Sequence, residues 1–93
     1  MKPPAYSATF LKTFKHLENN RQQAAVRTIE SLMSCVSESR ITYAGLGLKK
    51  LGKTYWEIRS SLADRIIFEW AEDQMIFRLI GSHNEVRRFL KSH

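Results

Sequence analysis

The order of apolar and polar residues predicts two helices in the first half of the chain. Ser7 suits a helix N-cap, and apolar residues recur behind it at helical spacing: Phe10, Leu11, Phe14 and Leu17. Asn19-Asn20 indicates a break, and a second helix is expected from about Arg21 or Gln22, with apolar residues at Ala25, Ile29, Leu32 and Val36. We interpret the two segments as an amphipathic helical hairpin, although one bent helix fits the same pattern.

The second half alternates between apolar and polar residues, as strands do. The three alternating segments are Tyr55 to Arg59, Arg65 to Trp70 and Gln74 to Ile80, and their short connections fit antiparallel hairpins. The helices are expected to cover the sheet face that bears Trp56, Ile58, Ile66, Phe68, Phe77 and Leu79. The opposite face would then hold Tyr55, Glu57, Arg59, Arg65, Glu69 and Arg78. A register shift of one residue would exchange the two faces.

The end of the chain predicts a third helix. Gly81 closes the last strand, and Ser82 to Glu85 fits the capping box S-x-x-E. Behind it, one helical face is apolar at Val86, Phe89 and Leu90. The predicted fold is α+β: an N-terminal helical hairpin packed on a small antiparallel sheet, with a short C-terminal helix and a single domain over 1–93. Pro3 and Pro4 leave room for no more than a short edge strand before the hairpin.

Composition adds a bias toward anionic partners. The 93 residues are 43% hydrophobic, which is too rich for a disordered basic tail, and the net charge is +6. Residues 1–46 carry six basic and three acidic groups and residues 47–93 carry nine and six, so each half is net +3. Cys35 is the one cysteine and cannot form an internal disulfide, so a cytoplasmic location is expected. It lies in a helical apolar pattern, which favours a buried structural role. No apolar run approaches the length of a membrane span.

Basic residues converge at the predicted start of the last helix. His83 falls in its first turn, where free backbone N–H groups and the helix dipole attract anions, and Arg87 lies one turn on. Arg59 and Arg65 belong to the neighbouring polar sheet face. This arrangement predicts a phosphate site, whereas the plainer interpretation is a solvated face with a surface histidine. Glu57 shares the face, as a second proton-transfer group or, more simply, as the partner of an arginine.

From Leu48 to Leu90 the chain resembles the RelE/ParE-type toxins of bacterial toxin–antitoxin systems. The segments that carry the resemblance are Leu48-Lys49-Lys50-Leu51-Gly52, Tyr55-Trp56-Glu57-Ile58-Arg59, Asp64-Arg65-Ile66-Ile67-Phe68, Ile80-Gly81-Ser82-His83 and Glu85-Val86. They are similar, in this order, to the family's K-x-L-x-G loop, its aromatic-x-x-[LI]-R and R-[IV]-[IV]-[YF] strands, and its V-G-x-[HR]…E-V-Y ending. The chain departs from the family where Arg87 replaces the final tyrosine and Ala63-Asp64 replaces a Gly-Tyr pair.

The resemblance implies a toxin of the RelE-like branch, which cuts mRNA on the ribosome without a metal or another cofactor. Attack by a ribose 2′-OH needs a base, an acid and positive charge on the phosphorane. His83 would be the general acid or base, and both roles stay open. Arg59 and Arg65 would hold the phosphate, and Arg87 would stand in for the tyrosine. The residues expected to contact RNA more broadly are Lys49, Lys50, Lys53 and Arg78.

Two other functions fit the same sequence. ParE-like members share the fold and inhibit DNA gyrase, but they lack the nuclease residues, so His83 with the two arginines favours the nuclease. A non-enzymatic RNA- or ribosome-binding module is the third interpretation. Either kind of toxin implies a cognate antitoxin, expected to be acidic and partly disordered and to fold over the basic sheet face or the helical hairpin.

Overall fold

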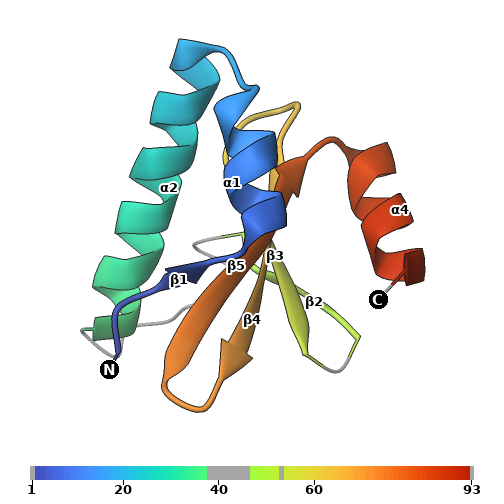
Figure 1. Cartoon of the computed structure of the whole chain (residues 1–93). Helices are drawn as coiled ribbons and strands as arrows, with labels where there is room; N and C mark the ends of the chain where they lie inside the picture. Colours follow the sequence, from blue (N-terminus) through green and yellow to red (C-terminus); the bar gives the residue numbers. More distant parts are fainter. Residues whose placement is uncertain (1, 38–46, 53, 93) are drawn as a thin grey trace.

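The computed structural model describes residues 2–37, 47–52 and 54–92. Along the chain the elements are β1 (Ala5–Tyr6), α1 (Ala8–Lys15), α2 (Asn19–Ser37), β2 (Lys49–Leu51), β3 (Tyr55–Arg59), β4 (Arg65–Ala71), β5 (Gln74–Gly81) and α4 (His83–Ser92) (Figure 1). Lys53, which we expected to contact RNA, lies outside the described residues. Within the described ranges, no helix has the length and apolar character of a membrane span.

The strands form one five-stranded sheet in the order β1-β5-β4-β3-β2. The three predicted strands are present and pair antiparallel, as expected. Two shorter strands complete the sheet: β2 pairs antiparallel with β3, and β1 pairs parallel with β5. The α+β prediction is therefore confirmed, but the expectation of a purely antiparallel sheet was wrong. The parallel pairing joins residues about seventy positions apart, beyond the reach of any local pattern.

The helical hairpin covers one face of this sheet (Figure 1). The Ser7 hydroxyl accepts a hydrogen bond from the Phe10 backbone N–H at 3.1 Å, which confirms the predicted N-cap of α1. The second helix begins at Asn19, two residues before the expected start. The core between hairpin and sheet consists of Phe10, Ala25, Ile29, Leu32, Ile58, Ile66, Phe68, Met75, Phe77 and Ile80.

A β-bulge in β5 changes which residues face the hairpin. Phe77 pairs with Phe68, but the next pairing is Leu79 with Ile67, so one residue of β5, Arg78, has no partner in the register. Beyond this point the alternation is shifted by one position. Ile80 joins the core under the hairpin and Leu79 lies on the opposite face. The prediction for Leu79 was wrong because strict alternation cannot anticipate an inserted residue.

The C-terminal helix α4 covers the centre of that opposite face. Buried Ile67 and Leu79 pack there against Val86, and Tyr55 meets Phe89 edge to face with ring centroids 5.6 Å apart. The face predicted to be polar is therefore apolar at its centre. Charged side chains remain around this second core, and the candidate chemistry lies among them.

An ion pair ties the hairpin to the β3–β4 connection. Arg21, in the first turn of α2, donates hydrogen bonds of 2.8 and 2.5 Å to the two carboxylate oxygens of Asp64. Asp64 is fully buried, and the Ser61 hydroxyl donates a further hydrogen bond to it at 3.2 Å. The guanidinium of Arg21 holds the pKa of the Asp64 carboxyl below its usual range, and the carboxylate raises the pKa of Arg21.

Candidate functional site

His83 is the first residue of α4, and its position is set by the predicted capping box. The Glu85 carboxylate accepts a hydrogen bond from the Ser82 backbone N–H at 3.0 Å, and the Ser82 hydroxyl accepts one from the Glu85 N–H at 3.3 Å. A Cβ on Gly81 would stand 3.0 Å from the carboxyl carbon of Glu85, so glycine makes room for the folded-back side chain. The imidazole of His83 is exposed.

The sheet register brings the two predicted arginines to the end of the sheet from which His83 leaves. Arg59 lies opposite Arg65 across β3 and β4, and Arg65 lies opposite Gly81 across β4 and β5. Adjacent strands lie about 4.8 Å apart, so the three backbones form one short row. His83 follows two residues beyond the row. The structure thus places the backbones of the three predicted site residues at one end of the sheet.

Arg65 is held in place by a carboxylate. Its Nε lies 3.5 Å from a Glu57 Oε, and the two side chains are only 15% and 11% exposed. This geometry agrees with the expectation that Glu57 pairs with an arginine. The pairing fixes the direction of the guanidinium and also neutralises part of its charge. Two arginines directly opposite on neighbouring strands repel each other, and this counter-ion reduces the repulsion.

Arg59 also borders a second surface, which the sequence did not predict. Among the described residues, β2 pairs with residues 55–57 and does not reach the end of β3, which lies beside α2. There Arg59 lines a pocket of about 280 Å³ together with Arg27 of α2 and Ser60. The sequence pattern gave no reason to expect Arg27 in this role, because helix α2 carries it on an exposed side.

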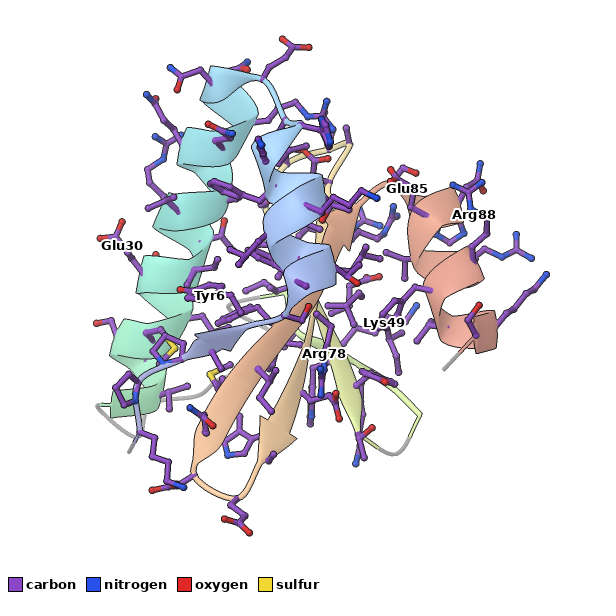
Figure 2. The ribbon with its side chains drawn as sticks, in the orientation of Figure 1. Tyr6, Glu30, Lys49, Arg78, Glu85 and Arg88 are labelled. Carbon is purple, nitrogen blue, oxygen red and sulfur yellow. The ribbon has the colours of Figure 1, made fainter. Side chains whose placement is uncertain are left out.

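The remaining predicted contacts are spread around the molecule. Arg78, at the bulge, forms an ion pair with Glu69 and lines a 190 Å³ cleft with Ser7, Thr9, Tyr55 and Phe89. Figure 2 shows Arg78 on β5, and Lys49 between the sheet and α4. Lys50 is exposed, with its Nζ 5.6 Å from the centre of the Trp56 ring, and Arg87 is exposed on α4.

Thiols and clusters of metal-binding side chains are few among the described residues. Cys35 is a free thiol and is partly buried, where a buried structural role was expected. The described ranges contain no group of three or more His, Cys, Asp or Glu side chains placed to hold a metal ion. Asp64 was missed as a structural anchor because its partner lies 43 positions away in the sequence.

Comparison with known proteins places this architecture among bacterial and archaeal toxins. A chain of the RelB–RelE antitoxin–toxin complex from Methanococcus jannaschii is 23% identical, with a TM-score of 0.70 over 91% of this chain and 96% of that one. YafQ from E. coli is 16% identical, with a TM-score of 0.68 over 92% and 98% of the two chains. A chain of the YoeB–YefM complex from Staphylococcus aureus is 16% identical, with a TM-score of 0.65 over 89% and 98%.

Sequence comparison gives no comparable match. No family model and no curated protein matches the chain. The structural neighbours are RelE-, YafQ- and YoeB-type toxins, so the chain has the fold of these toxins. At identities of 14–23% across the neighbours, the likeness is one of fold.

Proposed function

We propose that the protein is the toxin of a type II toxin–antitoxin system and that it cleaves mRNA on the ribosome as an endoribonuclease. The observation that carries the proposal is the row of Arg59, Arg65 and Gly81 at one end of the sheet, continued by His83 at the start of α4. This constellation stands on a fold shared with RelE, YafQ and YoeB. A net charge of +6 suits a polyanionic substrate.

In the proposed reaction the ribose 2′-OH attacks the adjacent phosphate and the 5′ oxygen leaves. His83 is exposed at the helix terminus, so it can approach either oxygen and act as the general acid or the general base. Arg65 is oriented by Glu57 and can meet the charge that develops on the phosphorane. One such donor is worth about 2.7–4 kcal/mol of transition-state stabilisation. Arg87, exposed on α4, would contact a neighbouring phosphate.

The Arg65–Glu57 pair is the feature that decides between an active and a degenerate enzyme. If substrate phosphate displaces Glu57, the guanidinium is free to act and the carboxylate becomes a second proton-transfer group. If the pair persists, positive charge is lost where the reaction needs it. The second outcome would leave a non-enzymatic RNA-binding module, so the experiment must measure cleavage and binding separately.

The experiment is cleavage of a reporter mRNA on purified translating ribosomes, followed by primer extension. His83→Ala should lower the cleavage rate by a factor of about 10² to 10⁴ because it removes the proton-transfer group. His16→Ala is the matched control, because His16 is an exposed histidine at the C-cap of α1 and should cleave at the wild-type rate. Equal rates for the two variants would refute the role of His83.

The role of Arg65 must be tested with a variant that leaves no unpaired buried charge. Arg65→Ala alone would strand the buried Glu57 carboxylate, so the double variant Arg65→Gln with Glu57→Gln is preferred. We expect this variant to keep its fold and to lose about 10²- to 10³-fold in cleavage rate. Salt-sensitive RNA binding without cleavage by the wild-type protein would support the binding module instead.

The proposed system also requires an antitoxin. A groove of about 270 Å³ between α1, α2 and the β1 strand is lined almost entirely by apolar side chains: Tyr6, Phe10, Leu11, Phe14, Val26, Ile29 and Glu30. Tyr6, Leu11 and Val26 are 41%, 54% and 44% exposed, an unusual amount of apolar surface to leave in water. A partner helix with an apolar face would bury it, and complexes with RelB and YefM are known for the structural neighbours.

A further inference from the structure

The pocket between α2 and the end of β3 has the composition of an anion site. Its walls are Arg27, Thr28 and Ser31 of α2 and Ile58, Arg59 and Ser60 at the end of β3. Two arginines and three residues with hydroxyl side chains thus border a space of about 280 Å³, and none of the described residues that line it is acidic. Within the described part of the chain, neither arginine takes part in an ion pair or a side-chain hydrogen bond.

Ser60 supplies an independent sign that a partner is missing. Its hydroxyl oxygen is enclosed and makes no hydrogen bond within the described residues. An enclosed hydroxyl without a partner costs about 1–3 kcal/mol. The Ser60 backbone is fixed, because its N–H donates to the Asp64 carbonyl at 3.1 Å. Ser60 is therefore a fixed residue of the pocket wall whose hydroxyl lacks a partner among the described residues.

The two walls of the pocket are held at a fixed separation. The Arg21–Asp64 pair joins the first turn of α2 to the loop that follows Ser60, and Asp64 is fully buried. The apolar side chains of Ala25 and Ile58 belong to one core beneath both walls. A ligand would therefore meet a preformed pocket and would not have to order it first.

We propose that this pocket binds a phosphodiester group of single-stranded RNA. The forked donors of arginine and the hydroxyls of Ser and Thr match the multiple oxygens of a phosphate. A protein partner would need an apolar anchor, and Ile58, itself buried, offers little apolar surface here. The choice of RNA as the source of the phosphate rests on the proposed function. Arg59 borders the pocket and also lies opposite Arg65, so a single RNA strand can pass from the row of residues at the end of the sheet to the pocket beside α2.

The test is RNA binding without cleavage. A fluorescent 2′-O-methyl oligonucleotide, which lacks the attacking hydroxyl, is titrated at several salt concentrations and followed by anisotropy. Arg27→Gln should weaken binding about tenfold and reduce the magnitude of the salt slope by about 0.7, the value for one phosphate contact on a single strand. Ser60→Ala should weaken it about threefold. Lys12→Gln, which removes one exposed charge from α1, is the matched control and should change affinity less than twofold.

Equal effects of Arg27→Gln and Lys12→Gln would overturn the proposal, because binding would then reflect net charge alone. Backbone amide resonances of Ala24, Thr28 and Ser60 should shift with the oligonucleotide. A shift with inorganic phosphate but not with the oligonucleotide would show an adventitious ion only and would also overturn it. Equal competition by polyglutamate would indicate a protein partner instead. If wild-type protein fails to cleave mRNA but the Arg27-dependent binding persists, the pocket stands and the proposed function falls.

Discussion

Replacing Arg21 by glutamine should strongly destabilise the fold, because Arg21 is the counter-ion of a fully buried carboxylate. Breaking a buried pair by removing one partner costs about 3–5 kcal/mol. The Arg21 side chain is 36% exposed, so water screens the interaction and we expect about 2–3 kcal/mol. For 93 residues the unfolding entropy is about 0.2 kcal/mol/K, so the Tm should fall by about 10–15 °C.

The pH dependence of this effect has a definite sign. The folded-state pKa of Asp64 is lowered, so its contribution to stability is fully present well above the unfolded value of about 3.9. The contribution is lost as the pH falls through the folded-state pKa. The difference between wild type and Arg21→Gln should therefore be largest near pH 7 and should shrink toward pH 3.

The assay is urea unfolding followed by tryptophan fluorescence at each pH. Arg27→Gln is the matched control, since it removes the same charge from the same helix without breaking an ion pair in the described residues, and should cost less than about 0.5 kcal/mol. Equal destabilisation by the two variants, or a difference that does not change with pH, would refute the reasoning.

Two further variants test the helix cap and the antitoxin groove. Ser82→Ala removes the acceptor of the Glu85 N–H and should lower the free energy of unfolding by about 1 kcal/mol in the same urea assay; no change would show that the capping box is not stabilising. Leu11→Glu should weaken capture of a co-expressed antitoxin at least tenfold, because it puts a charge into the apolar groove. Leu62→Glu, at a loop leucine that is 97% exposed, should bind the antitoxin normally, and equal loss in both would place the docking surface elsewhere.

Local patterns predicted the parts of the fold that local interactions determine. The strands β3, β4 and β5, the Ser7 cap and the Ser82–Glu85 capping box each follow from residues within one segment. The parallel pairing of β1 and the bulge at Arg78 depend on partners that are distant in the sequence, and neither was predicted.

The candidate site shows the same division. Arg59 and Arg65 lie at the same end of the sheet because β3 and β4 pair as a hairpin. The exposed position of His83 follows from the Ser82–Glu85 capping box. The pocket that Arg59 shares with Arg27 could not be predicted, because it depends on how α2 packs beside the end of β3. The burial of Ile67 under α4 is likewise a consequence of tertiary packing.

The most direct test of the central claim is the chemistry of the RNA ends produced on translating ribosomes. Attack by the 2′-OH predicts upstream fragments that end in a 2′,3′-cyclic phosphate or 3′-phosphate, and downstream fragments that begin with a 5′-hydroxyl. These ends should appear with the wild-type protein and with His16→Ala, and should be almost absent with His83→Ala. Intact mRNA with the wild-type protein, or fragments that carry 5′-phosphates, would contradict the account.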